Sequence, residues 1–514
     1  MPSPKEIEIK LQLPSAHSAR LAGMPWLRQA DASKQSENQL SVYFDTKRLK
    51  LKRHGLTLRV RQIGDRYIQT VKSENGSLFE RGEWETEIAG GRPELERAPA
   101  LEPLGIKKLS KKLRPVFETR VQRTTYPLAQ GDSDIALTID RGEIDAGKKT
   151  LPLCEAELEL KRGDRTRLFR VARKFARATA AELAVKSKSQ RGYDLLAGDG
   201  TAAVKGPEIR MAADMPAKAA FQAIASVCLK QIVANKPAVL AGDPEGIHQM
   251  RIGLRRLRAA MSLFSDMAAD AKAGPIKAEL KWLTAELGSA REFDVFLNKV
   301  VAPLQKRHAR LAGMRSLSRD LADRREAAVA RASEAIASKR FRDLTLDVAA
   351  WLETGGWAKA RSKRSRERGE APIKIAARAQ LSRRWKKMRK RGRQLAELAP
   401  QARHKLRIQA KKLRYATEFY QTVFTGKKTD KRRDAFLAAL KDMQDRFGEL
   451  NDIAVHEKLA AGIAKTPADK ASRPARRAFA AGLLRGHEEA RFTPVLTAAE
   501  HAFRAFEKLK PFWR

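Results

Sequence analysis

The sequence opens with EIEIKL at residues 6–11, which alternates charged and apolar side chains. In a β-strand, successive side chains point to opposite faces. Glu6, Glu8 and Lys10 would therefore share one face, and the isoleucines and leucine between them would share the other. The pattern predicts an amphipathic strand that carries acids and a base side by side.

Further segments, up to about residue 195, repeat this alternation between turn signals. Charged residues two positions apart include Arg59 and Arg61, Glu83 and Glu85, Glu155, Glu157 and Glu159, and Lys186 and Lys188. About eight strands make a barrel wide enough to hold a small ligand among side chains. We therefore expect an antiparallel barrel whose interior carries both signs of charge.

The mixture of charges indicates the chemistry of the ligand. Carboxylates hold hard divalent cations such as Mg²⁺ and Mn²⁺, while Arg and Lys bind phosphate oxygens through charge-assisted hydrogen bonds. One enclosed site could thus hold a metal and a phosphate chain together. The residues alone leave a second interpretation open, in which these charges form cross-strand ion pairs on the outside of the sheet.

Eight segments, in order, resemble the CYTH domain of the triphosphate tunnel metalloenzymes. They are EIEIK at 6–10, LRVR at 58–61, TVK at 70–72, EWE at 83–85, RPVFETRVQR at 114–123, IDRGEI at 139–144, CEAELEL at 154–160 and KSKSQRGYDLL at 186–196. The resemblance implies an eight-stranded antiparallel tunnel over residues 1–198. It also implies hydrolysis of inorganic triphosphate, or of a related triphosphorylated compound, with Mg²⁺ or Mn²⁺ as the metal.

The resemblance also implies roles for individual residues. The catalytic residues are Glu6, Glu8, Lys10 and Glu85, and Glu83 lines the tunnel beside Glu85. The phosphate-binding bases are Lys10, Arg59, Arg61, Lys72, Arg123 and Lys188. The metal ligands come from Glu6, Glu8, Asp140, Glu155, Glu157 and Glu159, and the pattern leaves open which of the last three bind the ion.

Three positions need a separate interpretation. Arg120 falls on the opposite strand face from Arg123, so we expect an exterior ion pair there. Gln190 stands where the family often has an acid, which affects only a peripheral contact. We expect a water molecule to attack the terminal phosphorus in line, without a covalent nucleophile. Cys154 is then a small core residue.

The charge of the chain is unevenly distributed. Of the formal net charge of +44, residues 201–514 carry +33, with 66 Lys and Arg against 33 Asp and Glu. Such a surplus predicts a polyanionic partner for the C-terminal part.

Location is predicted from the cysteines and the hydropathy. Cys154 and Cys228 are the only cysteines, which excludes a disulfide framework. We expect no membrane span and no apolar signal core. These features predict a cytoplasmic protein, with association with polyphosphate granules as a further expectation.

The C-terminal part contains an internal duplication. GIHQMRIGLRRLRAAMSLF begins at Gly246 and ARHKLRIQAKKLRYATEFY begins at Ala402, and ELGSAREFD is echoed downstream by RFGELNDI. We expect a linker at 199–216 and a helical domain at 217–512, with halves at about 217–355 and 372–512.

Each copy predicts a helix with a basic ridge. On a helix, a His and bases at offsets of three, seven and ten residues fall within about 80° of arc. The ridge residues are His248, Arg251, Arg255 and Arg258 in the first copy and His404, Arg407, Lys411 and Arg414 in the second. The duplicated region resembles the CHAD domain, which implies that these eight residues bind inorganic polyphosphate. Arg256 and Lys412 lie further round their helices and are weaker candidates.

Several alternatives stay open from the sequence. The chain could be a non-catalytic polyphosphate-binding scaffold, or an adenylate cyclase that uses the same tunnel. A nucleic-acid binder would also explain the charge. Because few aromatic residues flank the basic ridges, base-stacking platforms are scarce and nucleic acid is not expected as a specific partner.

Overall fold

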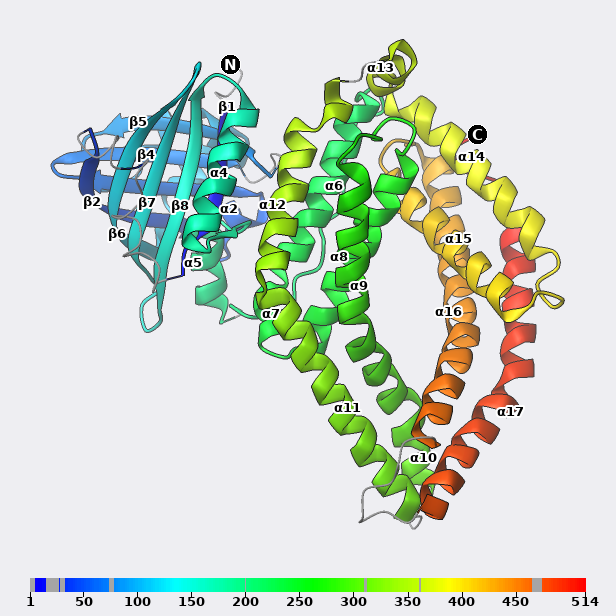
Figure 1. Ribbon diagram of the computed structural model, residues 1–514. Coiled ribbons are helices and arrows are strands. Elements are labelled where there is room, and N and C mark those ends of the chain that lie inside the picture. The colour runs from blue at the N-terminus through cyan, green and yellow to red at the C-terminus, as the bar shows by residue number, and fades with distance from the viewer. Residues whose placement is uncertain are drawn as a thin grey trace. The chain divides into compact units, whose positions relative to one another are not determined.

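The computed structural model of the protein describes residues 5–14, 27, 33–73, 78–198, 200–308, 312–359, 362–464 and 474–514 (Figure 1). The chain forms two compact units. The first contains residues 1–205 with Leu229–Gly246 and Ile336–Gly355. The second contains Gly206–Cys228, Ile247–Ala335 and Gly356–Arg514.

A sheet of nine described strands makes up most of the first unit. The strands are β1 (Lys5–Gln12), β2 (Gln35–Thr46), β3 (Leu56–Ile63), β4 (Arg66–Ser73), β5 (Glu80–Ile88), β6 (Leu113–Gln130), β7 (Ser133–Asp145), β8 (Thr150–Arg162) and β9 (Glu182–Leu183). Their order is β5-β4-β3-β2-β6-β7-β8-β1-β9, and all the pairings are antiparallel.

Strand β1 links the two sides of the sheet, because it pairs with β8 and also with β5, the first strand of the order. This strand pairs with β8 through five residue pairs and with β5 through only three. The sheet is thus joined along a short seam rather than along a full strand. The predicted fold class, an antiparallel sheet followed by helices, is confirmed. The strand count is nine rather than eight because the two-residue β9 also pairs with β1.

The alternation in β1 determines what the sheet encloses. Glu8 and Lys10 are 7% and 8% exposed and line an internal cavity, so their charges do not lie on the outside of the sheet. On the other face, Ile9 and Leu11 are fully buried. Helix α4 (Arg165–Thr179) contacts β1 and β8 and buries its own apolar face (Figure 1). Both faces of β1 are therefore covered, and the charged face is the inner one.

Short helices complete the first unit. They are α2 (Lys50–Arg53), α3 (Ile106–Ser110), α5 (Lys188–Ala197), α7 (Lys236–Leu240) and α12 (Lys339–Thr354), with 3₁₀ turns at Leu95–Arg97 and Pro99–Leu104. Leu58, Val60 and Val71 pack outward against Leu95 and Leu101. Because the apolar face of β3 and β4 packs outward against these 3₁₀ turns, the polar face of the two strands is turned to the interior.

Helix α5 packs against aromatic side chains of the sheet. Its N-cap is Ser187, which forms a capping box with Gln190, so the residue that replaces the family's acid has a structural role. Tyr193 packs edge-on against Phe117, and Phe117 stacks on Tyr43 with 4.5 Å between ring centroids. Because Phe117 has the same strand parity as Arg123, this aromatic cluster fills the interior beside the charged cavity.

Helices of six to 38 residues form the second unit. They are α8 (Pro244–Leu263), α9 (Ala273–Phe296), α10 (Ala302–Arg307), α11 (Ala312–Ala337), α13 (Lys363–Glu370), α14 (Ile373–Gly392), α15 (Pro400–Phe419), α16 (Lys427–Ala464) and α17 (Pro474–Glu507). Helix α6 (Ala217–Ala234) contributes residues to both units, and a π-helical turn at Leu297–Val301 follows α9. Helices α14, α15, α16 and α17 pack in sequence order, which places consecutive helices side by side (Figure 1).

One stretch within the described residues, Ala217–Leu240, is long and apolar enough to cross a membrane. Its mean hydropathy is 1.2, and 61% of the apolar window is buried. A helix in the interior of a protein has the same properties, so the stretch is weak evidence for a span.

The packing of α5 can be tested at Gly192. A Cβ atom at this position would lie 2.3 Å from the Phe117 ring, closer than carbon atoms can approach. We expect Gly192→Ala to lower the free energy of unfolding of the first unit by about 2 kcal/mol, the usual cost of overpacking. Gly90→Ala, which adds a Cβ with nothing within 4 Å, is the control and should change stability little. Equal unfolding midpoints for the two variants in denaturant titrations would contradict this packing.

Candidate functional site

A cavity of about 660 Å³ lies inside the sheet. Its lining contains seven bases, five acids and several hydroxyl groups. The lining residues are Glu8, Lys10, Tyr43, Thr57, Arg59, Arg61, Thr70, Lys72, Glu83, Glu85, Arg123, Glu157, Glu159, Leu160, Lys161, Ser187, Lys188 and Ser189, with Lys161 as an additional base near Glu159. The sheet thus collects both signs of charge in one enclosed volume.

One wall of the cavity comes from β3, β4 and β5. Their register places Arg59 opposite Thr70, and Thr70 opposite Glu85. The Arg59 and Arg61 guanidinium groups lie 3.8 and 3.7 Å from Glu85. Thr70 Oγ1 donates to Glu85 at 3.0 Å. The Nε atoms of both arginines are buried and have no hydrogen-bond partner.

Lys72 on this wall and Tyr43 on the neighbouring strand β2 add to the electrostatic environment of Arg59 and Glu83. Lys72 Nζ lies 2.7 Å from Glu83, which is also 3.8 Å from Arg59. Burial lowers the pKa of Arg59, but Tyr43, Glu83 and Glu85 outweigh it and raise that pKa above its ordinary value. Arg59 therefore stays charged inside the cavity.

A second wall comes from β1 and β8. Their register pairs Glu8 with Glu159 and Lys10 with Glu157. Lys10 Nζ lies 2.7 Å from both Glu8 and Glu157. Two acids of one strand thus meet an acid and a base of the next, which is the juxtaposition that the alternation in both segments predicts.

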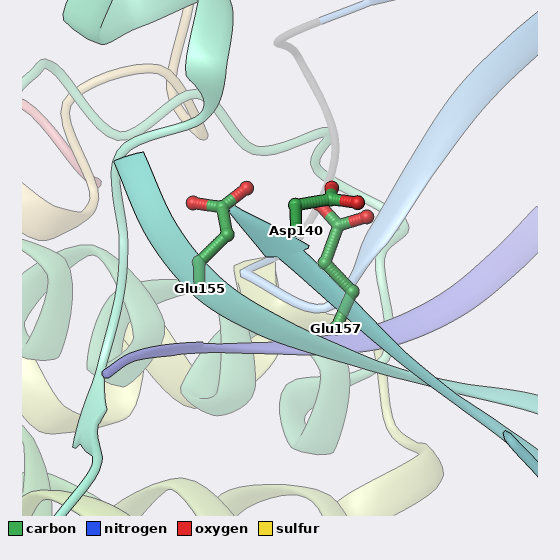
Figure 2. A group of neighbouring side chains, drawn as sticks. All are labelled: Asp140, Glu155 and Glu157. Carbon is green, nitrogen blue, oxygen red and sulfur yellow. The ribbon is translucent and has the colours of Figure 1, made fainter. Parts of the chain in front are cut away.

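Three carboxylates gather behind this wall. Asp140 on β7 and Glu155 and Glu157 on β8 each offer an oxygen atom within 4.8 Å of the others (Figure 2). Asp140 and Glu155 are fully buried. Because carboxylate oxygens are the ligands that Mg²⁺ and Mn²⁺ prefer, the donor set of this trio fits a divalent cation.

Bases from β6 and α5 neutralise the trio. Arg123 Nε and Nη2 lie 2.8 and 2.6 Å from the two Asp140 oxygens. Lys188 Nζ lies 2.6 Å from Asp140 and 3.1 Å from Glu157, and it also pairs with Glu155. Arg191 binds the other Glu155 oxygen and donates to Gln12 at 3.1 Å.

The pKa values follow from this pairing. Burial raises the pKa of Glu157, but Lys10, Lys188 and Arg123 lower it well below its ordinary value. Burial also raises the pKa of Asp140, and Lys188 and Arg123 lower it further than burial raises it. Conversely, the acids raise the pKa values of Lys188 and Arg123 despite their burial. All these groups are charged at neutral pH.

The structure brings together most of the residues predicted for the tunnel. Asp140 and Glu155 lie in contact with the cavity-lining bases rather than on the lining itself. The side chain of Glu6 lies outside the described residues. Arg120 is 56% exposed and pairs with Glu118, as expected for an exterior position.

Sequence reasoning missed several lining residues. Tyr43, Lys161, Ser187 and Ser189 contribute to the cavity. The parity of Tyr43 within its strand could have indicated an inward position, whereas the serines reach the cavity only because α5 begins there.

The two predicted basic ridges lie on α8 and α15. Arg251, Arg255, Arg407 and Lys411, which we call the inner cluster, repel one another across the two helices. Burial and then Arg255 lower the pKa of Arg251 to about 10. Burial and then Arg407 and Arg255 lower the pKa of Lys411 to about 7. The ridges of the two sequence copies therefore face each other.

The inner cluster has little compensation. In the described parts of the chain, no carboxylate forms an ion pair with these four residues, and the Nε atoms of Arg255 and Arg407 have no hydrogen-bond partner. Glu292 and Asp452 form no ion pair with these bases, but they oppose the repulsion, and for Arg407 the effect of Asp452 is larger than that of Arg255. An anion would therefore find a preformed set of donors.

The remaining ridge residues have other interaction partners than the members of the inner cluster. His404 Nδ1 lies 2.6 Å from Asn451 Oδ1, and Arg414 pairs with Glu418 at 2.6 Å. Arg258 is exposed. His248 lies near the start of α8 and makes its own contacts.

These features define a class of protein: a sheet that encloses a cavity lined by bases and carboxylates, followed by helices with a repeated basic ridge. The family model of the CYTH domain matches residues 4–193, and that of the CHAD domain matches residues 223–461. The chain therefore contains a CYTH domain followed by a CHAD domain. Both resemblances seen in the sequence are confirmed.

Solved structures are similar to separate parts of the chain. The CHAD domain from the plant Ricinus communis is 27% identical, matches 60% of this chain and 99% of that domain, and has a TM-score of 0.51. PptA from Streptomyces chartreusis is 17% identical over 56% of this chain and 99% of that one, with a TM-score of 0.42. HpAC1 from Hippeastrum, reported as a proposed adenylyl cyclase with a dominant triphosphatase activity, is 20% identical over 37% and 95%, with a TM-score of 0.30.

The role of Lys188 as counter-charge can be tested by pH. Because the folded-state pKa values of Asp140 and Glu157 are depressed, their pairing stabilises the fold above the ordinary carboxyl pKa, and this contribution is lost as pH falls. We expect Lys188→Met to cost about 3 kcal/mol of unfolding free energy at pH 7, without added metal, and clearly less at pH 3.

Lys186→Met is the matched control for this experiment. Lys186 pairs with the more exposed Asp194 at 2.8 Å, so its loss should cost less than about 1 kcal/mol. Calorimetric scans at both pH values would measure the difference. A cost for Lys188→Met that is independent of pH would contradict the assignment.

Proposed function

We propose that the cavity of the CYTH domain hydrolyses inorganic triphosphate, or a related triphosphorylated compound, with a divalent cation, and that the CHAD domain binds inorganic polyphosphate. The observation that carries the first part is the combination of two walls, one rich in arginine and the other in carboxylates, within a single cavity. A triphosphate needs both, because its negative charge must be neutralised before water can attack.

The bases would bind the phosphate chain. Arg59 and Arg61 each have a buried Nε without a hydrogen-bond partner, so they retain donor capacity for phosphate oxygens. Lys10, Lys72, Arg123 and Lys188 each contact carboxylates of the cavity. A phosphate chain would share or replace those carboxylate contacts.

The acids would hold the cation. Asp140, Glu155 and Glu157 fit a divalent cation by their donor set, and Glu8 and Glu159 meet in register on the cavity wall. Glu6 belongs to the proposed set from its place in EIEIK. When bound, Mg²⁺ or Mn²⁺ would neutralise phosphate charge and acidify a water molecule.

Glu8, Lys10 and Glu85 complete the proposed catalytic set with Glu6. Glu85 is held by Thr70 and lies beside both Arg59 and Arg61. Its carboxylate can therefore orient a water molecule close to the arginine-bound end of a phosphate chain. Lys10 lies between Glu8 and Glu157, where it can place a positive charge on the phosphoryl group.

The catalytic proposal is tested by phosphate release from inorganic triphosphate with Mg²⁺ or Mn²⁺. We expect metal-dependent turnover by the intact chain and at least a hundredfold loss of kcat in Glu8→Gln, by analogy with the loss of a group that acts on the transition state. Glu143→Gln, on the exposed side of β7, should retain activity within about twofold, since only a surface charge is lost.

The alternatives give different outcomes in the same assay. A folded chain that releases no phosphate from triphosphate or nucleotides would be a polyphosphate-binding scaffold instead. Cyclic AMP formed from ATP would indicate a cyclase. Equal losses in Glu8→Gln and Glu143→Gln would show that charge in general, rather than the cavity, determines activity.

Polyphosphate binding by the CHAD domain should depend on pH through Lys411. Burial and the neighbouring bases lower the pKa of this amine to about 7, so it is charged below that value and mostly neutral above it. A bound polyanion favours the charged form. We expect the affinity for long-chain polyphosphate to fall about tenfold between pH 6 and 8.5, the effect of one pKa unit, as measured by fluorescence anisotropy at constant salt.

The matched variants are Lys411→Arg and Lys374→Arg. Arginine stays charged across this range, so Lys411→Arg should flatten the dependence, whereas the exposed Lys374 should leave it unchanged. A steep dependence that survives in Lys411→Arg would place the titrating group elsewhere.

A further inference from the structure

A second set of uncompensated bases lies beside the inner cluster. Arg258 of α8, Lys412 of α15, and Arg384 and Lys387 of α14 form what we call the outer cluster. The charge of each of the other three lowers the pKa of Lys412, after the larger effect of burial. Helix α14 packs against α15, so three helices contribute to this cluster.

The outer cluster lacks counter-charges. Among the residues that the structure describes, no acid forms an ion pair or hydrogen bond with any of its four members. Arg384 Nε is buried without an acceptor, and burial, followed by Arg383, lowers the pKa of Arg384. Holding bases together in this way costs free energy unless an anion joins them.

Packing fixes the bases of α14 in place. The helix buries Leu381, Trp385 and Met388, and Arg378 Nε donates to the carbonyl of Trp513 at 3.0 Å. Helix α14 is therefore anchored by its buried face and by this hydrogen bond, and its packing against α15 keeps the backbone of Arg384 and Lys387 beside that helix.

The two clusters adjoin along both ridge helices. Lys411 of the inner cluster precedes Lys412 of the outer one, and Arg255 lies one turn from Arg258. A linear polyanion could contact both clusters at once, whereas a short anion bound at the inner cluster would leave the outer one empty.

We propose that the outer cluster is a second phosphate subsite that extends the inner cluster and gives the CHAD domain a preference for long polyphosphate chains. The inference rests on the proposed binding of polyphosphate by this domain. Its ligand is a linear phosphate polymer, because the clusters supply bases at adjoining positions but few aromatic surfaces for stacking nucleobases.

The test compares long-chain polyphosphate with tripolyphosphate. The full chain carries Arg59→Gln and Arg61→Gln throughout, so that the CYTH cavity contributes little to binding, and the buffers contain no divalent metal. We expect Arg384→Gln/Lys387→Gln to weaken long-chain binding about tenfold and to leave tripolyphosphate binding within about twofold. The slope of log affinity against log salt should fall by about 1.4, since each lost phosphate contact removes about 0.7.

The matched control is Lys374→Gln/Lys386→Gln. It removes the same charge from exposed positions of α14, each at least about 80° round the helix from both Arg384 and Lys387. Long-chain binding should change less than twofold. Arg384→Lys/Lys387→Arg, which keeps the charges, should restore binding and thereby separate a contact with the ligand from a role in folding.

Each other outcome overturns the inference in a distinct way. Equal weakening by the control variant would reveal unspecific attraction to a basic helix. Equal weakening of tripolyphosphate would deny a preference for length. Duplex DNA that competes better than polyphosphate at matched salt would make the clusters a nucleic-acid site. Absence of any polyphosphate binding by the starting chain would instead remove the proposed function of the CHAD domain.

Discussion

The cavity depends on one electrostatic constraint: charges enclosed by a sheet must be compensated where they lie. Strand alternation turns the acids and bases inward, where water cannot solvate them fully, and unpaired ions would cost several kcal/mol each. The register of the strands places opposite charges next to one another. Lys10 meets Glu157, Lys72 meets Glu83, and Arg123 meets Asp140. Helix α5 supplies Lys188 and Arg191 to the remaining carboxylates. The groups that hold the cavity in shape are therefore the same ones that would receive a ligand.

In the helical domain, by contrast, the bases of the two clusters are not paired with acids in the part of the chain that the structure describes. Its two basic clusters have almost no neighbouring acid in ion-pair contact, and the cost appears as depressed pKa values of Arg251, Lys411 and Lys412. These side chains are partly exposed, so solvent reduces the cost but does not remove it. A cavity with internal compensation can select a ligand by replacing contacts one for one, whereas an uncompensated face attracts any flexible polyanion and distinguishes among them by length and geometry.

Much of this could be predicted from the sequence, for physical reasons. A period of two assigns each strand residue to a face, so Arg123 and Arg120 could be separated before the structure, and the repeated offsets in the two helical copies indicated matching ridges. What escaped prediction depends on register or on packing between distant segments. The approach of Asp140 to Glu155 and Glu157 follows from the pairing of β7 with β8. The part played by α14 could not be predicted, because its bases carry no periodic signal that separates Arg384 and Lys387 from Lys386 and Lys390.

The aromatic cluster of Tyr43, Phe117 and Tyr193 has a consequence for how a phosphate chain could move. These rings fill the interior on the side where α5 packs, while Glu85 and Lys161 lie at the more exposed side of the cavity. A passage stopped by packed rings works as a blind socket rather than as a pore. A polymer could insert a terminus but could not be threaded through, so any shortening would proceed from the end of the chain, and released phosphate would have to leave by the entrance that the next terminus uses.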